Sequence, residues 1–172
     1  MVTKCHNVSG SVVLSQSTVK SSASRFRGRS DHSLDGKGRL NVPARFRDVL
    51  LRHYDERLMI TPPWHNCIRI YPFQEWEKRE TALLNMDNKP PHIVRMVRYL
   101  VGGINECHID KNGRLLLPAQ LRAQLNIKKK VVMNGMLDFF EIWDWETWES
   151  ESMPSAEDYT VYDQTFNDLG MY

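Results

Sequence analysis

One motif occurs twice in this chain, and each copy places an aspartate and an arginine around a glycine turn. The first copy runs from Asp35 to Arg47 and the second from Asp110 to Arg122, at a constant offset of 75 residues. Seven of the 13 positions are identical, which indicates an internal duplication. An arginine never deprotonates and makes bidentate hydrogen bonds to phosphate or to the edge of guanine. The chemistry that these residue types favour is therefore recognition of an anion or a nucleic acid.

The turn residues of Asp-x-x-Gly-Arg have two interpretations. In the first, Arg39 and Arg114 are offered to DNA. In the second, each arginine folds back onto its own aspartate, which also accepts backbone N–H groups as in an Asx-turn. We favour the structural interpretation for Asp35 and Asp110. We favour DNA contact for the two arginines, because the surrounding charge is basic.

Further basic residues flank the turns. Lys37 lies at the tip of the first turn, where the second copy has Asn112 and places Lys111 one position earlier. Arg25, Arg27 and Arg29 alternate, so on a strand they would share one face and form a positive stripe. The stripe is equally well explained as a solvated edge strand whose charges oppose pairing with another strand. The candidate DNA-binding residues are Lys37, Arg39, Arg114, Lys111, Arg27 and Arg29.

Charge is strongly segregated along the chain. Residues 25–47 contain seven Lys and Arg against two Asp, and residues 110–130 contain six against one. Residues 137–172 contain ten acidic residues and no Lys or Arg. Basic patches suit polyanions, whereas an acidic tail is typically a solvated or competing segment.

Other functional classes lack their motifs. The sequence has no Gx4GK[ST] phosphate loop, no GxSxG and no HExxH, so neither an enzyme nor a cofactor is predicted. Cys5, Cys67 and Cys107 form no CxxC pair, which argues against a metal site or a disulfide framework and favours a reducing cytosol. No apolar run approaches about 18 residues and no signal-peptide pattern is present, so we expect no membrane partner.

Hydrophobic periodicity and turn residues predict each half as strand, turn, strand, helix, strand, strand, helix. The predicted strands are 26–35, 39–42, 58–61, 67–71, 104–109, 114–117, 130–133 and 139–143, and the helices begin at Pro43, Phe73, His92 and Pro118. Phe46, Val49 and Leu50 should form the buried face of the first helix. Phe73, Trp76 and Leu84 are the expected core contacts of the second. The aromatic set Tyr71, Trp76, Trp143, Trp145 and Trp148 is assigned to core packing rather than to base stacking.

These elements imply an α+β fold of two pseudo-symmetric half-units with flanking helices. Residues 1–24 are Ser-rich and predicted to be disordered. The first repeat spans 25–88, a connecting helix 89–103 and the second repeat 104–150. Residues 151–172 are expected to form a loose acidic tail.

The doubled Asp-x-x-Gly-Arg-x-x-x-Pro-Ala-x-x-Arg motif resembles the MraZ family of bacterial transcriptional regulators. The match covers about residues 26–150 and includes Phe26-Arg-Gly28, His32 to Leu40, Ile70-Tyr-Pro72 with Trp76, and Gly103-x-x-Glu106. Each half-unit resembles the SpoVT-AbrB fold, a swapped-hairpin structure of β-barrel type. Family members normally begin close to Phe26, so residues 1–24 have no counterpart.

The resemblance implies a sequence-specific DNA-binding regulator of the cytoplasm and nucleoid. It would bind short direct repeats, as a ring-shaped homo-oligomer, at the promoter of the division and cell wall gene cluster, with no small-molecule substrate. The family's DNA-contacting residues map onto Lys37, Arg39 and Arg114. An alternative is an oligomeric scaffold whose basic turns bind an acidic protein partner.

Overall fold

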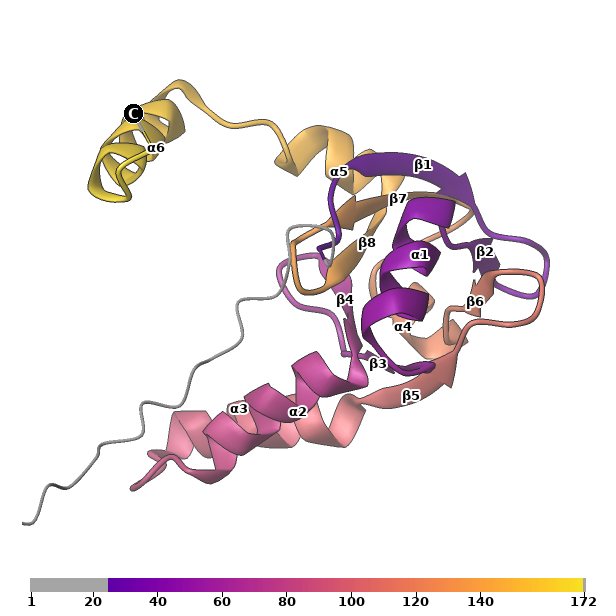
Figure 1. Cartoon of the computed structure of the whole chain (residues 1–172), viewed down its shortest axis with the longest axis horizontal. Coiled ribbons are helices and arrows are strands. Elements are labelled where there is room, and N and C mark those ends of the chain that lie inside the picture. The colour runs from indigo at the N-terminus through magenta and orange to yellow at the C-terminus, as the bar shows by residue number, and fades with distance from the viewer. Residues whose placement is uncertain (1–24, 172) are drawn as a thin grey trace, which may run out of the picture.

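The computed structural model describes residues 25–171, so the predicted disorder of residues 1–24 lies outside the described residues. Helices and strands alternate in two similar series, followed by an additional C-terminal helix (Figure 1). In chain order they are β1 (Arg29–Ser33), β2 (Arg39–Asn41), α1 (Ala44–His53), β3 (Arg57–Ile60), β4 (Cys67–Pro72), α2 (Phe73–Leu84), α3 (Pro91–Gly103), β5 (Asn105–His108), β6 (Arg114–Leu116), α4 (Ala119–Gln124), β7 (Lys130–Gly135), β8 (Phe140–Asp144), α5 (Trp145–Glu151) and α6 (Ala156–Asp168).

The strands form two antiparallel units. Six strands make one sheet in the order β1-β7-β8-β4-β3-β5, and β2 pairs with β6 in a separate two-stranded ribbon. This mixed architecture agrees with the α+β expectation, but the barrel type is wrong, because the described strands do not close into a barrel. The sheet stays open at β1 and β5, since β2 and β6 pair with each other.

The two sequence repeats interleave in this arrangement. β1 from the first repeat pairs with β7 from the second, with Asp31 opposite Val132. β2 likewise pairs with β6 rather than returning along β1, so the first turn does not close a local hairpin. The strand predicted over 26–35 is also shorter than expected. Gly28 adopts a positive φ of 84°, and Phe26 before it makes only an isolated bridge to Leu137.

Helix α1 buries the predicted face of Phe46, Val49 and Leu50. Helix α2 begins at Phe73 as predicted, yet Leu84 is 78% exposed, so the assignment of Leu84 to the core is wrong. Leu84 is the last residue of α2 and lies outside the buried face of the helix, which contains Trp76.

The loose tail expected beyond residue 150 is wrong in part, because residues 156–168 form helix α6. A capping box holds its start: the Ser155 hydroxyl accepts from the Asp158 N–H, and the Asp158 carboxylate accepts from the Ser155 N–H. Such caps satisfy backbone groups at a helix end that would otherwise lack partners. None of the helices within residues 25–171 combines the length and apolar character needed to cross a membrane.

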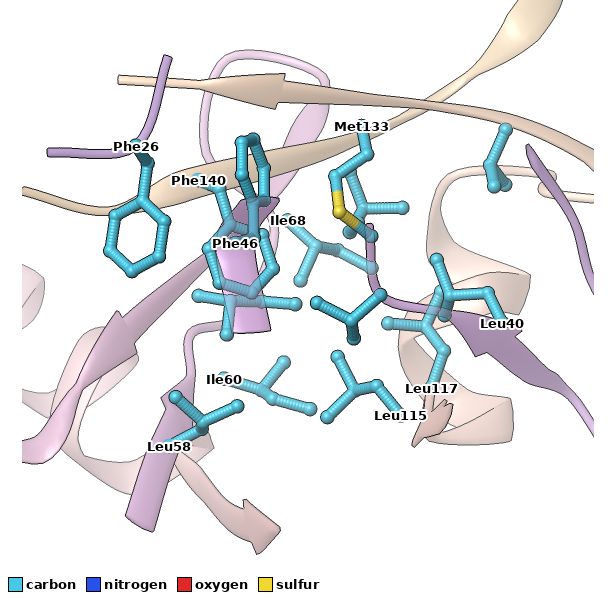
Figure 2. Packing of buried hydrophobic residues seen from close by; sticks show 14 of the residues in the cluster. Phe26, Leu40, Phe46, Leu58, Ile60, Ile68, Leu115, Leu117, Met133 and Phe140 are labelled. Carbon is cyan, nitrogen blue, oxygen red and sulfur yellow. The ribbon is translucent and has the colours of Figure 1, made fainter. Parts of the chain in front are cut away.

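The hydrophobic core joins both repeats (Figure 2). Phe26, Phe46 and Phe140 meet with ring centroids 5.3–5.4 Å apart, and all three are fully buried. Leu40 and Leu115 enter the same core from the β2–β6 ribbon. This burial anchors the ribbon to the body of the protein, because each fully buried large apolar side chain contributes about 1.5–3 kcal/mol.

Only part of the predicted aromatic core is buried. Tyr71 and Trp76 are 5% and 3% exposed and pack in a second cluster with Met59. The later tryptophans are partly exposed on or beside α5: Trp143, Trp145 and Trp148.

Candidate nucleic-acid interface

The first repeated turn is organised by Asp35. Its Oδ1 accepts hydrogen bonds from the backbone N–H groups of Lys37 and Arg39, both at 2.9 Å. The Gly38 N–H donates to the Asp35 carbonyl at 2.9 Å, with Gly38 at φ 80°. A glycine is favoured there because residues with a Cβ rarely adopt positive φ.

The second turn repeats this geometry around Asp110. The backbone N–H groups of Asn112 and Arg114 donate to Oδ1 at 2.9 Å, and Gly113 closes the turn at φ 76°. The structural interpretation of both aspartates is therefore confirmed. The duplication in the sequence is also a duplication of local geometry.

Each turn arginine also binds its own aspartate. Arg39 contacts Asp35 Oδ2 through Nε at 2.7 Å and through Nη2 at 2.6 Å. In the second copy, Nε and Nη2 of Arg114 both lie 2.9 Å from Asp110 Oδ2. The arginine side chains nevertheless remain 28% and 27% exposed. The fold-back contact and exposure to solvent therefore occur together.

These contacts hold both aspartates ionised. The side-chain hydrogen bond from Arg39 is the main cause that lowers the pKa of Asp35 from 3.8 to about 2. The pKa of Asp110 is lowered in the same way, chiefly by Arg114. A carboxylate that accepts several hydrogen bonds keeps its charge. The turns therefore retain their internal ion pairs throughout the neutral range.

The ribbon brings the two turns together. Leu40 lies opposite Leu115 and both are buried, so the alternate positions Arg39 and Arg114 lie on the other face of the ribbon. Arg114 Nη1 is 4.0 Å from Asp35 Oδ2, which links the second turn to the first. Asn41 and Leu116, exposed on the same outer face, complete the ribbon's solvent side. The predicted pair of turn arginines thus forms a single surface.

The tips of the turns add charge to this surface. Lys37 and Lys111 are exposed, one on each turn. We call the surface formed by Lys37, Arg39, Asn41, Lys111, Arg114 and Leu116 the ribbon face. Its four cations outnumber the turn carboxylates of Asp35 and Asp110 by two to one.

The sequence analysis gave no role to the last arginine of each motif copy, Arg47 or Arg122, and the structure places both against the turns. A Cβ on Gly38 would lie 2.8 Å from Arg122 Cζ, and a Cβ on Gly113 would lie 2.9 Å from Arg47 Cζ. Arg122 Nε also donates to the Leu117 carbonyl at 3.1 Å. The last arginine of each copy therefore packs over the turn glycine of the other copy. Both motif copies end in an arginine, and this shared residue was the signal in the sequence that could have pointed to the contact.

Arg27 and Arg29 are not part of the ribbon face, and they do not form one stripe. Only Arg29 lies in β1, so Arg25, Arg27 and Arg29 do not form the positive stripe that a shared strand would have given. Arg29 Nη2 lies 3.0 Å from Glu149 on α5 and 3.1 Å from Asp31. Its guanidinium is also 5.4 Å from the ring centroid of Trp148. The acidic C-terminal region thus already neutralises Arg29.

Other chemistry has little support in the described part of the chain. No group of three or more His, Cys, Asp or Glu residues there could hold a metal ion. Burial raises the pKa of both Cys67 and Cys107 to about 12. Both thiols are therefore protonated at neutral pH and are poor nucleophiles.

Comparison with known proteins agrees with the duplication. The model of the family described as "MraZ protein, putative antitoxin-like" matches residues 25–93 and again residues 100–164. A protein named Transcriptional regulator MraZ from Syntrophobacter fumaroxidans is 39% identical over 134 residues, covering 78% of this chain and 89% of the relative. The protein of that name from Thioalkalivibrio sulfidiphilus is 42% identical over 123 residues, covering 72% and 82%.

A third relative extends the match over a longer stretch. The Transcriptional regulator MraZ of Shewanella woodyi is 40% identical over 142 residues, covering 82% of this chain and 92% of the relative. The repeated turns, the interleaved sheet and matches of this extent lead to one conclusion. The chain belongs to the MraZ family, which is a family of transcriptional regulators and not of enzymes.

Proposed function

We propose that this protein is a sequence-specific DNA-binding transcriptional regulator that reads DNA with the ribbon face. The observation that carries the proposal is the convergence of Lys37, Arg39, Lys111 and Arg114 on one two-stranded ribbon anchored in the core. The major groove of B-DNA admits a two-stranded β-ribbon. The names of the relatives support a role in transcription.

The lysines and the arginines of the ribbon face have different roles in the proposed binding. Lys37 and Lys111 at the turn tips contact phosphates and set the position of the ribbon on the duplex. Asp35 takes Nε and Nη2 of Arg39, so we assign Nη1 of the planar guanidinium to a base edge or a phosphate. Arg114 is held by Asp110 through the same two nitrogens, and its Nη1 also lies 4.0 Å from Asp35 Oδ2. The aspartates thus orient the arginines before DNA arrives, which lowers the entropy cost of binding.

The proposed target is a set of short direct repeats in the promoter of the division and cell wall gene cluster. A single ribbon makes few contacts, so its preference for one repeat should be modest. A ring-shaped homo-oligomer that engages several repeats gains affinity through effective concentration. The proposed place of action is the nucleoid in the cytoplasm. The resemblance to the family supports these finer assignments.

The direct test is a titration of fluorescent duplexes followed by anisotropy. One duplex carries the protein's own upstream promoter region and the other a scrambled sequence of equal length. The wild type is compared with Lys37→Ala, which removes an exposed charge from the ribbon face. Lys89→Ala is the matched control, because Lys89 lies between α2 and α3, at the opposite end of the molecule from the turns (Figure 1).

The wild type is expected to prefer the promoter, and its affinity should fall steeply with salt. Lys37→Ala should weaken binding and reduce the slope of log K against log salt by about 1 per affected site, as expected for one lost phosphate contact. Lys89→Ala should match the wild type. If the wild type binds neither duplex, or both equally, the regulator proposal fails. The scaffold with an acidic partner then takes its place.

A further inference from the structure

Three helices in the described part of the chain have no buried residue, namely α3, α5 and α6, and α3 and α6 are the two long ones. α3 and α6 each contain 13 residues, and neither buries a side chain. Isolated helices of this length are marginally stable in water, and most helices in proteins depend on packing of an apolar face. Large apolar side chains are exposed on both helices: Val94, Tyr99 and Val101 on α3, and Tyr159, Val161, Tyr162 and Phe166 on α6.

The two helices carry opposite charge. α3 contains Arg95 and Arg98 and no acidic residue. α6 contains four acidic residues and no basic one, namely Glu157, Asp158, Asp163 and Asp168. Complementary potentials of this kind favour specific association and oppose pairing of like surfaces. α3 with α3 or α6 with α6 would bring like charges together.

A cavity beside α3 provides a receptor for aromatic side chains. It has a volume of about 360 Å³ and lies between α2, α3 and the β3–β4 side of the sheet. Trp64, Tyr71 and Trp76 line it together with the methionines Met86 and Met96. Methionine adapts its shape and makes favourable contacts with aromatic rings.

Two guanidiniums also line this cavity. Arg69 and Arg79 contribute to its wall, and no carboxylate is among its described lining residues. Their own carboxylate partners, Glu141 and Asp138, lie outside the lining. An occupant that combines aromatic rings with acidic groups would therefore match both parts of the wall.

Helix α6 has this combination along one face. Tyr159, Tyr162 and Phe166 follow the i, i+3, i+7 spacing of a single helical stripe. The rings of Tyr159 and Tyr162 are 6.1 Å apart, which places them side by side. Val161 lies outside this stripe, about 160° around the helix from Tyr159, about 140° from Phe166 and about 100° from Tyr162, because successive residues are rotated by about 100°.

We propose that the Tyr159–Tyr162–Phe166 face of α6 docks on the α2–α3 cavity of a second copy of this chain. Acidic side chains of α6 would then lie against Arg69, Arg79 and α3. The occupant is a second copy because α6 of the same chain stands apart from α2 and α3 (Figure 1). The inference rests on the proposed self-assembly and is independent of DNA binding.

Sedimentation velocity of the full chain without DNA, over a range of concentrations, tests the contact. Tyr162→Ala should weaken self-association at least about tenfold, as loss of an aromatic anchor does at protein interfaces. Val161→Ala, which removes an apolar side chain of α6 outside the stripe, should stay within about twofold of the wild type. Circular dichroism of each variant verifies that α6 remains helical.

A second pair of variants tests the charge of the receptor. Met86 lines the cavity and is 40% exposed, so polar substitutions there leave the core intact. Met86→Glu and Met86→Lys both remove the apolar contact, but only the glutamate repels acidic α6. Met86→Glu should therefore weaken association more than Met86→Lys. Equal effects of the two substitutions contradict charge complementarity.

Mixing distinguishes docking between chains from docking within one chain. Tyr162→Ala and Met86→Glu each retain one intact half of the interface, so an equimolar mixture should form 1:1 dimers that neither variant forms alone. A mixture that stays monomeric, or a Tyr162→Ala protein that assembles like the wild type, overturns this interface. A wild type that is monomeric at every concentration overturns the proposed self-assembly as well. The outcome of the DNA titration is separate from all of these.

Discussion

The Arg122 guanidinium packs directly over the Cα of Gly38, although the two residues belong to different copies of the repeated motif. A Cβ at Gly38 would lie 2.8 Å from Arg122 Cζ. The Gly38 carbonyl accepts the Leu117 N–H at 2.9 Å, and the Gly113 carbonyl accepts the Val42 N–H at the same distance. The turns that bear the candidate DNA-binding residues are thus each completed by the opposite repeat.

Gly38→Ala should destabilise the protein by about 1–3 kcal/mol, because an L residue at positive φ is strained and its methyl group meets the Arg122 side chain. Gly36→Ala is the matched control in the same turn, since a Cβ there meets nothing within 4 Å. Urea unfolding followed by tryptophan fluorescence measures both. Equal midpoints for the two variants would show that the inter-repeat contact at Gly38 contributes nothing.

Acid should remove the stability that the Asp35–Arg39 pair contributes. The folded-state pKa of Asp35 lies near 2, below its ordinary value of 3.8, so this contribution is present above about pH 4 and is lost as the pH falls toward 2. Thermal unfolding between pH 6 and 2 measures the decline. Asp35→Asn should be less stable at pH 6 and should lose less stability on acidification. Parallel curves for the two proteins would contradict the linkage.

Arg39→Lys separates the charge of the guanidinium from its geometry. Lysine keeps the positive charge but lacks the planar fork that binds Asp35 and presents a remaining N–H group. We expect Arg39→Lys to retain binding to scrambled DNA and to lose preference for the promoter. Arg39→Ala should lose both. Anisotropy titrations of both duplexes measure the ratio, and an unchanged promoter preference in Arg39→Lys would exclude base recognition by Arg39.

Glu149→Gln should raise the affinity for DNA by about twofold to fivefold, because an exposed ion pair contributes up to about 1 kcal/mol. Arg29 would lose its 3.0 Å contact with Glu149 and keep only the 3.1 Å contact with Asp31, so its charge would be less neutralised toward DNA. Glu146→Gln is the control, since it removes the same charge from α5 without touching Arg29. If both variants gain equally, net charge rather than the Arg29 contact limits binding.

Residues 35–39 and 110–114 show how much of the local structure can be predicted from the sequence alone. The aspartate, glycine and arginine of each turn interact within four positions of one another, so their residue types already predict the turn. The buried face of α1 was predictable for the same reason, because helical spacing relates residues three and four apart. The family could likewise be identified from the doubled motif.

Pairing between distant segments was decided only in the tertiary structure. The pairing of β1 with β7 and of β2 with β6 depends on competition among all strands, so the local turn predicted neither the open sheet nor the interleaved repeats. The same is true of Arg29, which binds Glu149 120 positions along the chain. The exposure of Leu84 depends on which neighbours the fold supplies.

The sequence by itself therefore determined the repeated turns, most helices and the residue types of the ribbon face. The tertiary structure decided that both turns share one ribbon, that Arg47 and Arg122 complete them, and that α3 and α6 remain uncovered. The physical reason is the range of the interactions. Backbone conformation and capping act over a few residues, whereas strand pairing and burial depend on which distant surfaces meet in the folded chain.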